Sequence, residues 1–407
     1  MSQPTPRSVA EAPHLPVLDG VRGLAIALVI AFHCVSITAV AKADWLFTIP
    51  LSCGWTGVDL FFVLSGFLIT GILLDSRGSA RYFRSFYARR VLRIFPLYYA
   101  ILVLSLWVLP GLLPAHKAAR FGAIAGDTAY YWVYLSNFVV AKHGFRHAVL
   151  DVTWSLAIEE QFYLLWPIIV LLASRRALVR VAVAVLVSAL ALRVVMRLGL
   201  GSSGFATYVL TPCRIDALAA GALVAALSRG PGGLAAVRGH ARTAALIAGP
   251  IAAFALVRES LTVNWVTLPG ETVFMATVGF TAIDVTFAAL LVRVLTDPPD
   301  SALRRLFNTR TLRTFGKYSY GMYLFHLPIR AVIRDLAYGA GWTSAPIKFH
   351  RLLGSEVPGQ ILFIPMAMAA SLAVAWISYR VFEAPILRLK RFFPTERTIA
   401  VVSRAAP

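Results

Sequence analysis

The chain has 407 residues, of which 58% are hydrophobic and only 14% are charged, and its mean hydropathy is +0.73. This composition excludes a soluble globular protein and is typical of an integral membrane protein. The net charge of +20 could suggest a partner made of nucleic acid. The cations follow a membrane topology instead, so we expect no nucleic-acid partner.

Ten apolar segments are long enough to cross a bilayer as helices. The segments between them are mostly short and polar, and with the N-terminus placed inside, most of the 39 lysines and arginines fall on inside segments. The positive-inside rule then places both termini in the cytoplasm. The sequence predicts an all-α, polytopic membrane protein with about ten transmembrane helices, near residues 17–40, 57–74, 91–110, 154–173, 179–198, 206–227, 243–258, 272–295, 316–338 and 361–383.

Three regions follow from this pattern. Residues 1–16 are polar and contain proline, which predicts a disordered cytoplasmic N-terminus. Residues 17–385 form one transmembrane domain. Residues 386–407 form a short, basic tail, and we expect this cytoplasmic tail to lie on the anionic inner leaflet.

The first span, LDGVRGLAIALVIAFH, contains two ionisable residues, Arg22 and His33. Their separation of eleven residues returns to within roughly 20° of the same helix face and rises about 16 Å along the axis. Ionisable residues within a span indicate a functional site. We expect Arg22 to bind an anion near one membrane surface and His33 to accept a proton near mid-depth.

The second span, GVDLFFVLSGFLITG, contains Asp59 near its outer end and Gly66 at its middle. We interpret Gly66 as a site of close helix packing. Asp59 lies at a depth comparable with His33, so we expect its carboxylate to orient the imidazole and to stabilise its protonated form.

The third span begins with RYFRSFYARRVLRIFP, which is rich in arginine. Ordinary topological anchoring explains the residues outside the span in part. Arg89, Arg90 and Arg93 continue into the apolar run, and Arg90 and Arg93 share a helix face. Guanidinium groups in this position suit bidentate binding of phosphates that arrive from the cytosol.

The fourth span begins with TWSLAIEEQFYLLWP, which places Ser155, Glu159 and Glu160 near its outer end. Successive helical residues point about 100° apart, so at most one of the two carboxylates should face a given cavity. The other is expected to pair with an intramembrane cation such as Arg214, for which CRIDALAAG also suggests a pair with Asp216.

The later spans add further polar groups. YSYGMYLFHLP contains Tyr320, Tyr323 and His326, and a single histidine there is more often a hydrogen-bonded packing residue than a base. Glu383 in FEAP is a candidate partner for an inside arginine. The outer connection contains the aromatic stretch 130–138, which suits either a sugar-like ligand or, as we favour, an interfacial aromatic belt.

These motifs in this order resemble the acyltransferase 3 family of membrane-bound O-acyltransferases, which modify extracytoplasmic sugars and some small molecules. The resemblance extends from Leu18 to Pro385. It implies about ten spans and acyl-CoA, with acetyl-CoA as the expected donor, as co-substrate. It also implies that Arg22 and His33 form the Arg-x10-His motif, with His33 essential, and that Arg90 and Arg93 form the Arg-x-x-Arg motif.

The residues and the resemblance together predict an enzyme of a bacterial cytoplasmic membrane that transfers an acyl group to a hydroxyl of an extracytoplasmic carbohydrate, glycolipid or small molecule. We expect no metal and no tightly bound cofactor, and the sequence leaves self-association open. The predicted catalytic residues are His33, Asp59 and Glu160. The predicted substrate-binding residues are Arg22, Arg89, Arg90, Arg93, Ser155 and Tyr320.

The alternative of a different class is a transporter or flippase of a lipid-linked saccharide, in which the same buried charges would form a proton or anion path. Such proteins commonly contain repeated halves or broken helices in matching positions. The sequence contains no such internal repeat. We therefore favour the enzyme.

Overall fold

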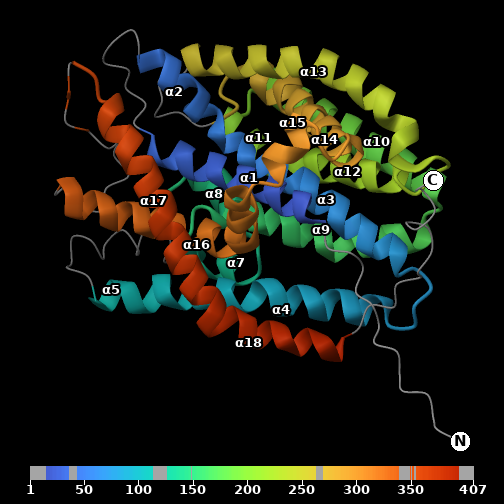
Figure 1. Ribbon diagram of the computed structural model, residues 1–407, viewed down its shortest axis with the longest axis horizontal. Helices are drawn as coiled ribbons and strands as arrows, with labels where there is room; N and C mark the ends of the chain where they lie inside the picture. The colour runs from blue at the N-terminus through green and yellow to red at the C-terminus, as the bar shows by residue number, and fades with distance from the viewer. Residues whose placement is uncertain are drawn as a thin grey trace, which may run out of the picture.

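The computed structural model in Figure 1 describes residues 15–35, 44–112, 126–147, 149–262, 269–338, 349, 351–352 and 354–393. Within these residues the regular secondary structure is helical, apart from one isolated bridge between Leu352 and Ser355. The predictions on the N-terminal segment and on most of the basic tail concern residues 1–14 and 394–407, which lie outside this description.

The long α-helices of the described residues overlap the predicted spans, shorter α-helices lie between them, and short 3-10 or π-helical segments extend several of the long ones. Their bounds are α1 Pro16–Cys34, α2 Trp45–Ser52, α3 Gly57–Asp75, α4 Tyr82–Val103, α5 Leu109–Leu112, α7 Thr128–Trp132, α8 Ser136–His143, α9 Thr153–Leu172, α10 Arg175–Val194, α11 Gly204–Val209, α12 Thr211–Leu227, α13 Gly233–Thr262, α14 Phe280–Thr296, α15 Ala302–Phe307, α16 Arg310–Tyr338, α17 Val357–Ser378 and α18 Ala384–Leu387.

Nine helical stretches in the described part of the chain are long and apolar enough to cross a membrane. The predicted span at 316–338 corresponds to α16, a helix of 29 residues whose many polar side chains lower its hydropathy. The chain is therefore an all-α, polytopic membrane protein, as the sequence predicts. In Figure 1 α4 and α13 lie at opposite edges of the bundle, with α1 between them.

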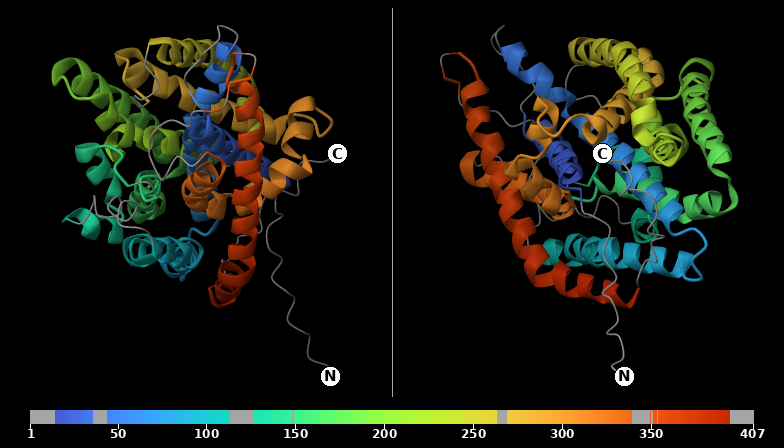
Figure 2. Two further views of the ribbon diagram at one scale, coloured as in Figure 1. Left: turned by 90° about the vertical axis from the view of Figure 1, so that its left-hand side faces the viewer. Right: turned by 45° about the vertical axis from the view of Figure 1, so that its right-hand side comes forward.

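The helix α1 is the centre of the bundle because α3, α16 and α17 all pack against it. Figure 2 shows α1 enclosed by these helices from two further directions. The contact with α16 is very close, since a Cβ atom on Gly316 would lie only 1.8 Å from the backbone oxygen of Asp19. The absence of a side chain at Gly316 thus brings the polar residues of α16 next to Arg22 and His33.

A similar contact joins α3 to α12. A Cβ atom on Gly66 would lie 1.9 Å from the backbone oxygen of Leu218, so the two backbones touch at this point. This confirms the interpretation of Gly66 as a packing residue.

Part of the aromatic stretch at 130–138 lies inside the protein. Tyr131 and Tyr134 are buried, and the Tyr134 ring stacks on Tyr98 of α4 with centroids 4.3 Å apart. Tyr130 and Phe138 remain exposed. The stretch therefore fixes the outer connection onto α4, in addition to any contact that its exposed rings make with the bilayer.

Candidate active site

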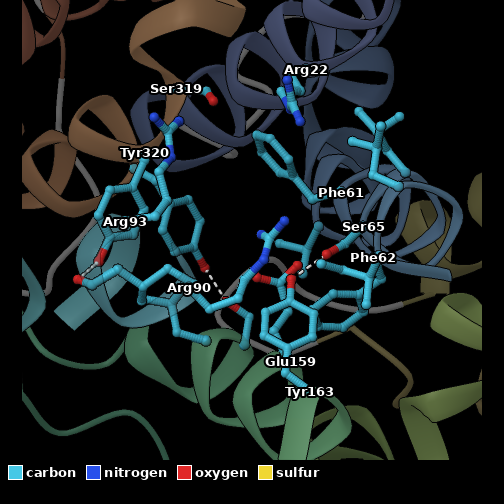
Figure 3. A pocket seen from close by; sticks show the side chains of 18 residues that line it. Arg22, Phe61, Phe62, Ser65, Arg90, Arg93, Glu159, Tyr163, Ser319 and Tyr320 are labelled. Carbon is cyan, nitrogen blue, oxygen red and sulfur yellow. Dashed lines mark hydrogen bonds between the residues drawn. The ribbon is translucent and has the colours of Figure 1, made fainter. Parts of the chain in front are cut away.

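Two neighbouring cavities lie between α1, α3, α9 and α16. The first, here called the inner cavity, has an empty volume of about 890 Å³ and is also bounded by α4. Figure 3 shows the side chains around it. The residues on which the argument depends are Arg22, Ser65, Arg90, Arg93, Ser155, Glu159, Tyr163, Tyr320 and Tyr323.

The inner cavity contains more positive than negative charge. Arg22 from α1 and Arg90 and Arg93 from α4 all line it, although the two helices are far apart in the sequence. Nη1 of Arg22 is 3.0 Å from Oδ1 of Asp19, one turn earlier on the same helix. The remaining cations face one carboxylate of the lining, Glu159. Such a cavity suits a ligand with several negative charges.

Arg89 does not line this cavity, which corrects its prediction as a substrate-binding residue. Its Nη1 donates hydrogen bonds to the backbone oxygens of Lys390 at 3.4 Å and Phe393 at 3.2 Å. Arg89 and Arg90 are adjacent, so their side chains point about 100° apart on the helix. The guanidinium of Arg89 therefore holds the C-terminal helical segment against α4, while that of Arg90 faces the cavity.

As expected, only one of the two adjacent glutamates faces the inner cavity. This residue is Glu159, whereas the sequence analysis predicted Glu160 as catalytic. Glu159 lines the inner cavity and interacts with Ser65, Tyr163 and Arg90, whereas Glu160 is not part of the lining. Figure 3 shows Glu159 beside Tyr163 and Ser65, whose hydroxyls are hydrogen-bonded to each other. The guanidinium of Arg90 lies over the Tyr163 ring, 5.5 Å from its centroid. The geometry thus favours Glu159 over Glu160.

The second cavity, here called the outer cavity, has an empty volume of about 930 Å³ and contains His33. It lies further along α1, toward the end at Cys34. Its lining is largely aromatic and aliphatic with a few charged groups, and includes Trp55, Phe145, Asp151, Trp154, Tyr208, Tyr323, Arg330 and Arg334.

The hydrogen bonds of His33 define which ring nitrogen is free to act. Its Nδ1 is 2.9 Å from the backbone oxygen of Val29, and a carbonyl oxygen only accepts, so we assign the proton to Nδ1. His326 is assigned in the same way, because its Nδ1 is 2.6 Å from the backbone oxygen of Tyr323. Its Nε2, 3.3 Å from Nδ1 of His33, then accepts. In the neutral pair, Nε2 of His33 carries a lone pair, and no group among the described residues donates a hydrogen bond to it.

Val58 and Tyr323 line both cavities and therefore form part of the partition between them. The Tyr323 hydroxyl is 2.6 Å from the hydroxyl of Ser155 and donates to the backbone oxygen of Val152 at 3.0 Å. The predicted residue Ser155 thus lies at the partition. Tyr320, also predicted, lines the inner cavity, and its hydroxyl donates to the backbone oxygen of Ile94 at 2.6 Å.

Asp59 does not orient His33, which corrects the role predicted for it. It is fully buried, and its Oδ1 accepts a hydrogen bond from Nη2 of Arg214 within an ion pair. The sequence suggested that Arg214 pairs with the nearby Asp216, and this prediction is wrong. Asp216 instead forms an ion pair of 2.7 Å with Arg193. These two pairs connect α3, α10 and α12, so they hold these helices together.

Asp151 precedes α9 and lines the outer cavity from outside the membrane-spanning segments. Its Oδ1 accepts hydrogen bonds from the backbone N–H groups of Arg146 at 3.2 Å and His147 at 2.9 Å. Burial nevertheless raises the pKa of Asp151 to about 7. At neutral pH this carboxyl is therefore only partly ionised.

Sequence reasoning missed Tyr323 as a partition residue, the proximity of His326 to His33, and Arg330. The spacing of Tyr323, Leu327, Arg330 and Arg334 places them on one face of α16, and this pattern was visible in the sequence. The sequence did not show which neighbouring helix this face meets, because the rotation of α16 about its axis depends on its contact with α1.

The chain matches a known protein family over most of its length. The profile of the acyltransferase domain family matches residues 15–380, which include every site residue named above. Solved structures offer no significant match.

Several curated bacterial proteins are similar to this chain. The O-acetyltransferase OatA of Staphylococcus aureus (strain NCTC 8325 / PS 47) is 28% identical over 391 residues, which cover 92% of this chain and 57% of that protein. The putative peptidoglycan O-acetyltransferase YrhL of Bacillus subtilis (strain 168) is 29% identical, with 92% and 55% covered. The peptidoglycan O-acetyltransferase OatA of Listeria monocytogenes is 27% identical, with 92% and 56% covered. The chain thus spans a little over half the length of these relatives, and it belongs to the acyltransferase 3 family.

Proposed function

We propose that this protein is a membrane-bound O-acyltransferase that uses cytosolic acyl-CoA, acetyl-CoA in the simplest case, to acylate a hydroxyl of an extracytoplasmic carbohydrate, glycolipid or small molecule. One observation carries the proposal. A cationic cavity and a cavity containing His33 lie next to each other and share Val58 and Tyr323. A donor and an acceptor that enter from opposite sides of the membrane would meet at this partition.

The donor occupies the inner cavity in this proposal. The phosphates of acyl-CoA bind to Arg22, Arg90 and Arg93, which lie toward the cytoplasmic side if the topology is as the positive-inside rule predicts. The uncharged pantetheine arm then extends along α1 toward His33. The distance of about 16 Å between the levels of Arg22 and His33 separates the nucleotide from the reacting thioester.

The acceptor occupies the outer cavity, where Nε2 of His33 acts as the general base. It removes the proton from the acceptor hydroxyl while the oxygen attacks the thioester carbonyl carbon. The C–S bond then breaks, the new ester forms, and the proton passes from His33 to the CoA thiolate. The hydroxyls of Ser155 and Tyr323 lie at the partition, and one of them stabilises the oxyanion once it turns its proton away from the backbone oxygen of Val152.

His326 positions His33 in this mechanism and does not touch the substrate. Its neutral Nε2 accepts from Nδ1 of His33, together with the Val29 oxygen, so both contacts hold the tautomer that leaves Nε2 free to accept the proton. Two relatives carry peptidoglycan in their names, which supports peptidoglycan as the acceptor, and the bacterial origin of the relatives supports a bacterial cytoplasmic membrane as the location.

The test uses the full chain in nanodiscs with acetyl-CoA labelled in the acetyl group. An acyltransferase consumes the thioester, releases CoA thiol and moves the label to an added acceptor such as peptidoglycan fragments. A transporter or flippase would leave the thioester intact under the same conditions. If the thioester stays intact with every cell-envelope fraction that is added as acceptor, the proposal is overturned.

A further inference from the structure

The outer cavity contains a cation that the proposed mechanism does not use. Arg330 of α16 lines this cavity together with His33, and the side chain is half-buried. Its position is close enough to His33 and Cys34 for its charge to act on both. A cation so near the reacting centre requires an explanation, since charged residues within a membrane domain are costly and are rarely retained without a partner.

The described residues offer Arg330 no carboxylate partner. The ion pairs of the described chain do not include it, and its Nε is buried without a hydrogen bond. Other arginines deep in the bundle behave differently, since Arg193 pairs with Asp216 and Arg214 with Asp59. The guanidinium of Arg330 is therefore available to a ligand in the cavity.

The position of Arg330 relative to the base is set by helix geometry. Arg330 lies four residues after His326, which touches His33, so it stands about 6 Å further along α16. Tyr323, Leu327, Arg330 and Arg334 share one helix face, and all four line the outer cavity. An acceptor whose hydroxyl lies at His33 therefore has its neighbouring groups beside Arg330.

The remainder of the lining suits a saccharide. Trp55, Trp154 and Tyr208 contribute flat aromatic faces, and they pack edge to face or tilted against one another, with ring centroids 5.7 Å apart for Trp55 and Tyr208 and 4.8 Å apart for Trp154 and Tyr208. Asp151 is the acidic residue of the lining, and its charge is incomplete at neutral pH. The cavity thus combines aromatic surfaces with an excess of positive charge.

We propose that Arg330 binds an anionic group of the acceptor, so that the acylated compound is an acidic saccharide that carries a carboxylate or a phosphate close to the hydroxyl that reacts. This rests on the proposed function, because it assigns the outer cavity to the acceptor. Bidentate pairing of the guanidinium with the anion would hold the hydroxyl at Nε2 of His33.

Binding without acyl-CoA tests this directly. The probes are methyl glucuronide, its neutral counterpart methyl glucoside, and a glucose phosphate monoester, each titrated by ligand-observed NMR into the full chain in nanodiscs of phosphatidylcholine, which carries no net charge. We expect the wild-type protein to bind at least one of the two acidic probes about tenfold more tightly than the neutral probe. The stronger of the two acidic probes identifies the carboxylate or the phosphate as the recognised group.

Substitutions assign that preference to Arg330. Arg330→Gln should abolish the preference for acidic probes. Arg330→Lys, which keeps the charge without the fork geometry, should retain part of this preference. Arg313→Gln removes an exposed cation from the same helix and should leave it unchanged. Equal binding of acidic and neutral probes by the wild type, or an acid preference that survives in Arg330→Gln, overturns the inference. Because no acyl-CoA is present, these outcomes are independent of whether the protein consumes the thioester.

Discussion

His33 and His326 come from the first and the last third of the chain, yet Nε2 of His326 lies 3.3 Å from Nδ1 of His33. Their ring centroids are 4.9 Å apart. The contact exists because α1 and α16 approach each other closely around Gly316. It connects the proposed base to a second ring that orients it, and it leads to the first two predictions.

Replacing His33 with alanine should lower the rate of acyl transfer by about a hundredfold or more, since general-base catalysis contributes factors of this size. The affinity for CoA should stay unchanged, because His33 lines the outer cavity and the arginines line the inner one. CoA release and CoA binding, measured on the same preparation, check both statements. Full activity of this variant would remove the mechanism.

Replacing His326 with alanine should reduce turnover by about tenfold, less than the loss at His33, because the bond from Nδ1 of His33 to the Val29 oxygen remains. The KM for acyl-CoA should not change. His143→Ala is the control, since His143 pairs with Asp127 and does not line either cavity. An equal loss for His33→Ala and His326→Ala would show that the two rings cannot be assigned separate roles.

Lysine substitutions separate phosphate binding from topological anchoring among the arginines of α4. Arg90→Lys and Arg93→Lys keep the charge but lose the fork geometry, and CoA affinity should fall by about tenfold or more, since charge-assisted bonds contribute roughly 1.5–3 kcal/mol. Arg89→Lys should leave CoA affinity unchanged and lower thermal stability, because Arg89 bonds to the backbone of Lys390 and Phe393. The same CoA affinity in all three variants would refute the inner cavity as the donor site.

Asp59→Asn should destabilise the fold by about 3 kcal/mol, because the buried guanidinium of Arg214 loses the carboxylate with which it forms an ion pair. Thermal unfolding in detergent measures the loss. Replacing both members by apolar residues, Asp59→Leu together with Arg214→Met, should retain more stability than Asp59→Asn, since a buried pair replaced as a whole by apolar groups is often tolerated. A single variant as stable as the wild type would show that the pair does not hold α3 to α12.

Asp151 should make stability depend on pH. Its pKa is raised from 3.8 to about 7 in the folded protein, so unfolding releases a proton between these values and stability falls as the pH rises through this window. The free energy of unfolding changes by about 1.4 kcal/mol per pH unit where Asp151 is protonated in the folded protein and ionised in the unfolded one. Asp151→Asn keeps an oxygen for the backbone N–H groups of Arg146 and His147 and should flatten the dependence of the unfolding temperature between pH 5 and 8. Identical pH profiles for the two proteins would contradict the shifted pKa.

The sequence alone was sufficient for the spans and for most cavity-lining cations. Membrane insertion depends on local apolar composition and on the distribution of arginines, and both are properties of contiguous residues. Arg22 and His33 are on one helix, so their separation of about 16 Å follows from helix geometry without any tertiary contact. Arg90 and Arg93 share a face for the same reason.

Only the tertiary structure decided which polar groups meet across helices. Asp59 was expected beside His33 and pairs with Arg214, Glu159 takes the place expected for Glu160, and His326 touches the ring of His33. These contacts depend on the rotation of each helix about its axis and on its depth relative to its neighbours. Both are set by close packing at small residues such as Gly66 and Gly316, where a difference of one residue in register turns a side chain by about 100°.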